Sequence, residues 1–178
     1  MAFSPGDFKS QLIYGGSRGN LFQFNISFPQ NLVANAGVAS AKISFMAKAA
    51  SLPASSLPAV EVPYFGRTIK VAGDRQFNPF NVTVINDEDF VVRNALEAWS
   101  NAIKTHETNL GIVKPADYKV DFEVIQYGKD STIIKTYKFV GSYPTDISEI
   151  GLDWGNNNSI EEFNVTFSVD YWTANTTS

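Results

Sequence analysis

The chain has 178 residues, of which 44% are hydrophobic and 18% charged, and its net charge is −4. This length suits one domain with one core, and the negative charge argues against a surface that grips phosphates, because nucleic-acid binders carry clustered Lys and Arg. The absence of cysteine excludes disulfides and thiolate metal sites. We therefore expect a single domain, residues 1–178, that folds in a cytosolic environment.

The first third of the chain is expected to be mostly β. Residues 1–19 are polar and Gly-rich, which predicts a flexible N-terminal arm. Residues 20–28 alternate between polar and apolar side chains, so they are predicted to form a strand with one apolar face. Residues 29–40 are expected to be a long connection, and residues 41–50 a second strand. That strand would place Ile43, Phe45, Ala47 and Ala49 on one face and Lys42, Ser44, Met46 and Lys48 on the other.

The middle of the chain predicts a hairpin, a strand and one helix. Residues 59–64 and 67–72 flank a short Phe65-Gly66 turn, and residues 79–86 form the next strand. Residues 88–104 are predicted to be an amphipathic helix that packs on a sheet. Its apolar positions, Val92, Ala95, Leu96, Trp99, Ala102 and Ile103, recur at helical spacing. Asn86-Asp87-Glu88-Asp89 is expected to start the helix, with a short polar side chain as its cap and acidic residues in its first turn.

The last third is expected to return to β structure. Residues 119–127 and 132–140 are predicted to form a hairpin. A chain break is expected at 143–146, because Pro144 cannot donate to a strand ladder, and a short strand is expected near 147–153.

The C-terminal segment completes the predicted sheet. Residues 159–172 alternate cleanly and predict one long strand, and residues 173–178 a flexible polar tail. About eight strands and one substantial helix predict a mainly β fold, a β-sandwich or partly open barrel with one flanking helix and an extended β-ribbon.

The search for catalytic and metal-binding patterns gives no candidate. His106 is the one histidine and lies in a polar segment, where a solvated role is the expected one. Asn86-Asp87-Glu88-Asp89 lacks the spacing of a calcium loop. The Gly-rich segment 15–19 lacks the Lys-Ser/Thr pair of a phosphate loop. We therefore expect no catalytic residues, no metal and no cofactor, and a protein that is not an enzyme.

The sequence does show a surface that suits association. The ribbon from Lys42 to Val71 is long, interrupted by two Leu-Pro steps and rich in small residues. Long unprotected edges invite pairing with another chain, and head-to-tail pairing gives closed rings or filaments. The alternative is a monomer whose ribbon folds back on its own sheet. No signal peptide and no membrane anchor are expected from the residue pattern.

Several short segments between about Asn20 and Trp172 occur in a distinctive order: Asn20-Leu21-Phe22, Lys48-Ala49 with Leu52-Pro53-Ala54, Val62-Pro63, Arg67 to Arg75, Val82-Thr83-Val84, Asn86-Asp87-Glu88, Lys114-Pro115-Ala116 and Leu152-Asp153-Trp154. In these segments and the gaps between them, the chain resembles the tail tube proteins of contractile-tailed, T-even-like bacteriophages. The departure is the 29–40 connection, which looks longer than in those proteins.

The resemblance implies a β-sandwich-like subunit that acts by self-assembly. Six subunits would form a ring, their ribbons would line a channel, and stacked rings would make the inner tube of a phage tail. It implies partners, namely other copies of the chain, the tail sheath, baseplate, tape-measure and tail-terminator proteins, and double-stranded DNA held transiently and non-specifically in the lumen. It also implies a location in the virion after assembly in the host cytoplasm.

The candidate inter-subunit or channel-lining residues lie on the ribbon: Lys42, Ser44, Met46, Lys48, Glu61, Arg67, Lys70, Asp74 and Arg75. Some of the Lys and Arg side chains in this set are expected to form ion pairs with carboxylates across subunit boundaries. Two other functions stay open at this point. One is the related tube subunit of a type VI secretion apparatus, and the other is a monomeric ligand-binding β-sandwich module.

Overall fold

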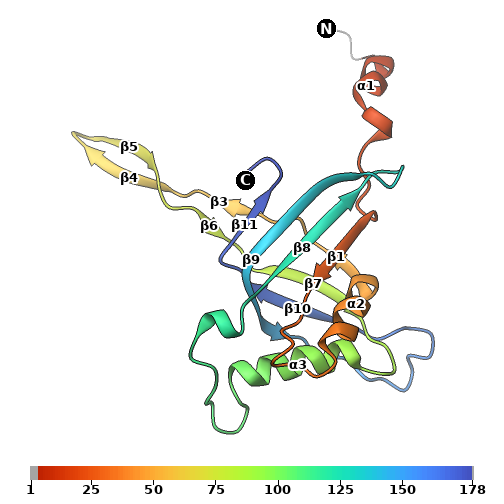
Figure 1. Cartoon of the computed structure of the whole chain (residues 1–178). Helices are drawn as coiled ribbons and strands as arrows, with labels where there is room; N and C mark the ends of the chain where they lie inside the picture. Colours follow the sequence, from red (N-terminus) through yellow and green to blue (C-terminus); the bar gives the residue numbers. More distant parts are fainter. Residues whose placement is uncertain (1–3, 178) are drawn as a thin grey trace.

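A computed structural model describes residues 4–177 of the chain. Seven strands form one antiparallel sheet, which folds into two crossing layers (Figure 1), in the order β1-β8-β9-β10-β7-β2, with β11 also paired to β9. The strands are β1 (Phe22–Ile26), β2 (Ala47–Ala50), β7 (Phe80–Ile85), β8 (Val120–Tyr127), β9 (Ile133–Ile147), β10 (Glu162–Ser168) and β11 (Tyr171–Ala174).

Strand β9 connects the two layers because it changes partners along its length. Its first part pairs with β8 and β11, and its last part pairs with β10. Gly141 lies at the change of partner with a φ of 66°, which a residue with a side chain adopts only with strain. A Cβ there would also lie 2.2 Å from the Asp170 carboxylate. The bend therefore depends on glycine at this position.

The predicted break at residues 143–146 is wrong, because β9 continues through Pro144. Pro144 lies opposite Phe167, where the register of β10 shifts, and such an irregularity is where a strand tolerates proline. The predicted strand at 147–153 is therefore the end of β9 followed by a loop. The predicted strand at 159–172 is also corrected, since it divides into β10 and β11, which pair with different parts of β9.

Phenylalanines from both layers fill the space between them. Phe24, Phe80, Phe122, Phe139 and Phe167 are all buried. The ring centroids of Phe122 and Phe139 are 4.5 Å apart, and those of Phe80 and Phe139 are 4.8 Å apart, distances at which aromatic pairs attract. The alternating apolar positions of the predicted strands are therefore confirmed as the core.

Helix α3 (Val91–Ile103) confirms the predicted helix, although it begins three residues later. Its apolar stripe, Val92, Ala95, Leu96 and Trp99, is buried. The Trp99 indole nitrogen donates a hydrogen bond to the Tyr118 carbonyl at 2.9 Å. The acidic first turn expected from the sequence is wrong, because Phe90 is the residue that precedes the first turn and that turn contains no acidic residue. Asp89 lies just before the helix and accepts a hydrogen bond from the Val91 amide at 3.2 Å.

A second helix, α2 (Ala36–Met46), corrects the sequence prediction of a connection at 29–40 and a strand at 41–50. It buries Ala36, Ala39 and Ile43 over β1 and against α3, whereas Phe45 is 83% exposed. Strand structure is confirmed only for Ala47–Ala50. The fold thus has two flanking helices rather than one. The edge strands β1 and β2 approach each other near α2 without pairing, which leaves the barrel partly open.

The ends of the chain contain short elements. Helix α1 (Pro5–Gln11) and the 3-10 turn η1 (Ile13–Gly15) lie inside the predicted N-terminal arm and project from the body (Figure 1). At the C-terminal end of the chain, β11 reaches Ala174, so the predicted tail begins inside a strand. Between α3 and β8, a second 3-10 turn, η2, spans Pro115–Asp117. The flexibility of both ends stays a prediction, and residues 1–3 and 178 lie outside the described residues. Among residues 4–177, no helix has the length and apolar character to cross a bilayer.

Candidate self-assembly surface

A two-stranded hairpin projects far from the body of the subunit (Figure 1). Its strands, β4 (Ala59–Tyr64) and β5 (Arg67–Ala72), confirm the predicted strands at 59–64 and 67–72. At its base lies a small sheet made of β3 (Ser55–Ser56) and β6 (Gln76–Phe77). Every residue of β4 and β5 is exposed. An isolated hairpin is only marginally stable in water, so this one lacks the packing that usually holds such an element.

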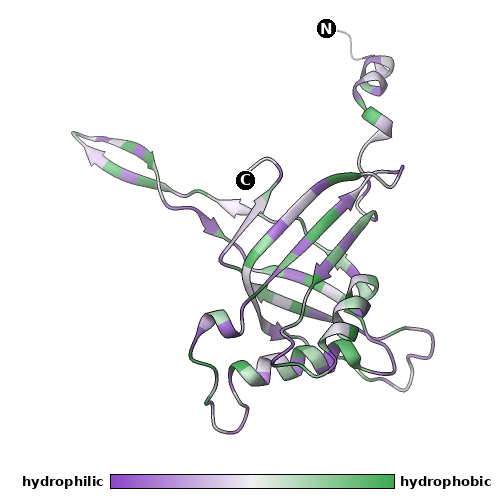
Figure 2. Cartoon of the chain, viewed as in Figure 1, coloured by the Kyte–Doolittle hydropathy of each residue, from purple (hydrophilic) through white to green (hydrophobic). Residues whose placement is uncertain are grey.

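The hairpin has one apolar face and one mixed face, because its residues alternate across the pleat. Cross-strand partners share a face, and the pairs Val60–Val71, Val62–Ile69 and Tyr64–Arg67 define the apolar face. The opposite face carries Glu61, Thr68 and Lys70. Figure 2 shows the resulting alternation of hydrophobic and hydrophilic residues along both strands. One face of the hairpin therefore exposes a continuous apolar strip to water.

The turn of the hairpin holds an aromatic residue in an unfavourable backbone conformation. Phe65 has a φ of 44° and Gly66 a φ of 78°. Positive φ at both central residues is the pattern of a type I′ turn, in which Asn-Gly is the favoured pair. A bulky residue there is strained, and the Phe65 side chain is also 92% exposed. This tip thus combines backbone strain with an exposed ring.

Three of the predicted ribbon residues, Lys42, Ser44 and Met46, are on α2 and not on a strand of the ribbon, which corrects their expected position. Lys42 forms ion pairs with Asp87 and Asp89, which precede α3. Hydrogen bonds from Lys42 lower the pKa of both carboxyls, and hydrogen bonds to Asp87 and Asp89 raise the pKa of Lys42. Lys42 therefore fastens α2 to the start of α3.

Ser44 and Met46 also make their contacts within their own chain. The Ser44 hydroxyl donates a hydrogen bond to the Ala41 carbonyl at 2.7 Å, inside the helix. Met46 packs partly buried against the core. Their roles within the chain are thus structural, and the role predicted for them at a subunit boundary stays a prediction.

The remaining predicted residues do lie on or beside the ribbon. Lys48 is on β2 and pairs with Glu162 of β10. Glu61 and Lys70 face each other across the hairpin at 3.3 Å, so they need no second subunit for pairing. Arg67, next to the tip, makes no ion pair within residues 4–177.

Asp74 and Arg75 lie in the link between β5 and β6. The Arg75 guanidinium donates a hydrogen bond to the Ser55 hydroxyl at 3.3 Å, across the base of the hairpin. The structure therefore gathers the hairpin residues on one projecting element, with Lys48 on the sheet and Lys42, Ser44 and Met46 on a helix away from that element.

The N-terminal arm is a second apolar element that sequence reasoning missed. Phe8, Ile13 and Tyr14 are exposed on α1 and the turn that follows it. The arm touches the body where Lys129 donates a hydrogen bond to the Tyr14 carbonyl, and a hollow of about 430 Å³ lies between the arm and the β8–β9 turn. The apolar run Leu12-Ile13-Tyr14 was the available signal, but its setting among Gly and polar residues favoured a flexible segment.

The hairpin and the arm have the features of protein–protein contact surfaces. Among the described residues, no group of three or more His, Asp or Glu side chains is placed to hold a metal ion. His106 is exposed in the loop after α3. The hairpin and the arm instead offer apolar side chains and free strand edges, which are the features of an association surface.

Comparison of the sequence with known families agrees with this picture. A family model described as "Phage tail tube protein" matches residues 17–175. The "Tail tube protein gp19" of Enterobacteria phage T4 is 37% identical over 173 residues, covering 96% of this chain and 94% of that protein. Its counterpart in Enterobacteria phage T6 is 36% identical over the same length.

Solved structures share the fold at lower sequence identity. The tube terminating cap of the anti-feeding prophage has a TM-score of 0.63 at 18% identity, covering 89% of each chain. A chain of the PVC sheath–tube complex, from an extracellular contractile injection system in its extended state, has a TM-score of 0.57 at 16% identity, covering 97% of this chain and 98% of that chain. These likenesses show the fold alone. The family match and the T4 relative show that the chain belongs to the phage tail tube protein family.

Proposed function

We propose that six copies of this chain close into a ring, that the rings stack into a hollow tube, and that the tube conducts the phage genome into the host. The single observation that carries the proposal is the β4–β5 hairpin, with its apolar strip and exposed edges. Membership of the tail tube family supports the tube, and the resemblance to T-even tail tube proteins supports the ring of six.

The hairpin suits this role because it does not pack against the body of its own subunit. All of its residues are exposed, and Val60 and Ile69 still expose 52% and 53% of their surface. Docking of the apolar strip onto another copy would remove the exposed Val, Ile and Tyr side chains from water and would satisfy the free strand edges. The contact is heterologous, since a hairpin meets a different surface of the next copy, and heterologous contacts close into rings when the rotation allows it.

The partners follow from the same role. One structural neighbour is a chain of a sheath–tube complex, and another caps a tube. We infer that this tube is surrounded by a tail sheath, begins on a baseplate and ends at a terminator, as a component of the virion. The net charge of −4 per subunit favours passage of DNA without adhesion, because a negative tube repels phosphates.

The proposal is tested by assembly of the purified chain, followed by sedimentation and negative-stain electron microscopy. We expect hollow rings or tubes from the unmodified chain, either spontaneously or on a tail baseplate. Ile69→Lys, which places a charge on the apolar strip, should abolish assembly. Thr68→Lys is the matched control, because it adds the same charge to the neighbouring position on the opposite face.

Two results would contradict the proposal. One is a monodisperse species of about 19.6 kDa, the mass of one chain, that also fails to polymerise on a baseplate. The other is tube formation that both lysine variants retain equally, which would remove the hairpin from the assembly surface. Circular dichroism of each variant separates loss of assembly from loss of folding.

A further inference from the structure

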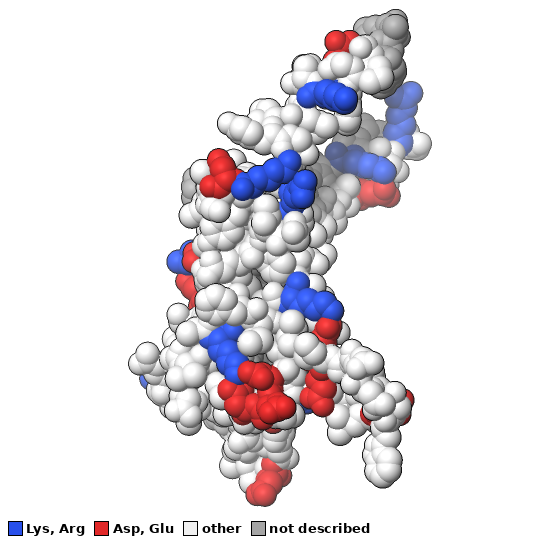
Figure 3. All heavy atoms as spheres, turned by 90° about the vertical axis from the view of Figure 1, so that its right-hand side faces the viewer, with Lys and Arg blue, Asp and Glu red and all other residues white. Residues whose placement is uncertain are grey.

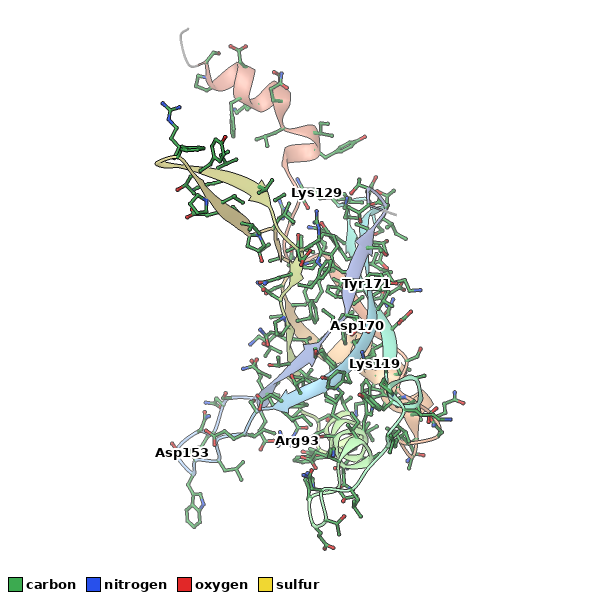
Figure 4. The ribbon with its side chains drawn as sticks, turned by 90° about the vertical axis from the view of Figure 1, so that its left-hand side faces the viewer. Arg93, Lys119, Lys129, Asp153, Asp170 and Tyr171 are labelled. Atoms are coloured by element: carbon green, nitrogen blue, oxygen red, sulfur yellow. The ribbon has the colours of Figure 1, made fainter. Side chains whose placement is uncertain are left out.

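A third exposed apolar element lies at the end of the subunit opposite the hairpin. The loop between β9 and β10, residues 148–161, projects away from the body, and Figure 4 shows Asp153 at its outer end, far from the hairpin. Leu152 and Ile160 are exposed, and Trp154 is 100% exposed. Single exposed apolar residues are common on protein surfaces, whereas several large ones gathered on one element mark an interaction site. Trp is among the residue types most enriched at interface hot spots.

A hydrogen-bonded turn holds the backbone of the loop at Trp154. The Gly155 amide donates a hydrogen bond to the Asp153 carboxylate at 2.9 Å, and the Asn156 amide donates to the Asp153 carbonyl at 3.1 Å. These two bonds close a tight turn at Trp154, whose side chain is fully exposed. The indole therefore faces away from its own subunit, as the hairpin tip does at the other end.

The two ends also differ in charge. No Lys or Arg follows Lys138, and the loop carries Glu149, Asp153 and Glu161. The hairpin tip carries Arg67, which has no ion-pair partner within residues 4–177. On the face in Figure 3, acidic side chains gather toward the end opposite the N-terminal arm, and basic side chains are more frequent near the arm. Opposite charges at opposite ends favour head-to-tail contact and disfavour tip-to-tip or loop-to-loop contact.

Backbone strain at the tip gives the same indication. Phe65 occupies a left-handed position that Asn would fill at lower cost, and its ring is solvated. Strain of this kind persists where a residue serves a function. A contact that buries the ring would explain both the residue type and its position.

We propose that the hairpin tip, Tyr64 to Arg67, docks on the Trp154 loop, residues 148–161, of a second copy of this chain in the adjacent ring, with Arg67 beside the Asp153 carboxylate. The proposal rests on the stacked-ring tube proposed above and assigns the contact that joins one ring to the next. The aromatic side chains supply the buried centre of this contact, and the ion pair sets its direction.

The first test uses variants that spare the fold. Phe65→Asn removes the phenyl group but introduces the favoured Asn-Gly turn, so the hairpin should be at least as stable as before. Trp154→Ala removes the exposed indole. Each should raise the protein concentration needed for tubes by about tenfold or more, as for an interface hot spot, while rings still form. Val113→Ala, an exposed apolar change in the separate loop after α3, is the control and should have no effect.

The second test uses reversed charges in trans. Arg67→Glu alone places an acidic tip against an acidic loop, and Asp153→Lys alone places a basic tip against a basic loop, so neither variant should form tubes. Mixed together, rings of the two variants meet opposite charges at every junction and should form tubes again. Recovery in the mixture requires contact between tip and loop of different copies.

The outcomes separate this inference from the proposed function. If the unmodified chain forms tubes, and Phe65→Asn, Trp154→Ala and both charge variants do so at the same concentration, the tip–loop contact is wrong and the tube function stands. Failure of the mixture to recover, when each single variant is defective, also overturns the contact. If the unmodified chain forms neither rings nor tubes, even on a baseplate, both proposals fall.

Discussion

Helix α2 makes a quantitative prediction, because it separates Ile43 from Phe45. Ile43 is fully buried, and Phe45 is 83% exposed. Ile43→Ala deletes three buried carbons, each worth about 0.8 kcal/mol of transfer free energy, or about 2.4 kcal/mol in all. The cavity that remains adds to this cost. We therefore expect the free energy of unfolding to fall by about 3 to 4 kcal/mol for Ile43→Ala and by no more than about 0.5 kcal/mol for Phe45→Ala.

The assay is urea unfolding of dilute, unassembled protein, followed by circular dichroism. For a domain of this size the Ile43→Ala variant should also melt roughly 6 to 16 °C lower. If it does not fold, Ile43→Val gives the same comparison at a cost of about 1 kcal/mol. Equal losses for the two alanine variants would rule out the helix at 36–46, because a strand would place both side chains on one face, whereas the helix places them on different faces.

Two further predictions concern contacts that hold the helices in place. Trp99→Phe removes the hydrogen bond to the Tyr118 carbonyl. The free energy of unfolding, measured from urea unfolding, should therefore fall by about 1 to 3 kcal/mol. An unchanged urea midpoint would contradict the assigned contact. The Lys42 ion pairs predict a pH dependence, measured as the difference in stability between the unmodified chain and Lys42→Met. Because the pKa values of Asp87 and Asp89 are lowered, their contribution is present above the ordinary value of about 3.9 and is lost as the pH falls through their folded values. Because the pKa of Lys42 is raised, its contribution is present below about 10.4 and is lost as the pH rises through its folded value. A difference that stayed constant from pH 2 to pH 12 would contradict this assignment.

Local signals were sufficient where a segment carries its own pattern. The alternating strands were predicted because one face of each is buried, and the hairpin because Phe65-Gly66 separates two β-rich runs. Helix α3 was predicted because its apolar residues recur at helical spacing. These elements give most of the fold, and the hairpin gives the main part of the candidate assembly surface.

Other features depend on contacts that one segment cannot reveal. In α2 the buried positions are spaced as in a helix, yet Ile43 and Phe45 also fit an alternating strand, and only packing against β1 and α3 decides between the two. Proline usually ends a strand, yet β9 continues through Pro144. The irregularity that accommodates Pro144 belongs to the partner strand β10, so the segment itself does not reveal it.

The same limit applies to the site residues. Lys42 was placed on the ribbon because its segment was predicted as a strand, whereas its side chain pairs with carboxylates that lie more than forty residues further along the chain. The Gly- and Asn-rich segment after Trp154 indicated a loop. Its position opposite the hairpin depends on the whole topology, which sequence periodicity does not encode.

Cryo-electron microscopy of the assembled protein, at a resolution that shows side chains, would reveal whether the chain builds a tube through its hairpin. We expect stacked rings of six subunits around an open channel, with the apolar strip of β4 and β5 covered by other copies of the chain. Tubes in which this strip faces solvent, or an assembly without rings, would rule out assembly through the hairpin.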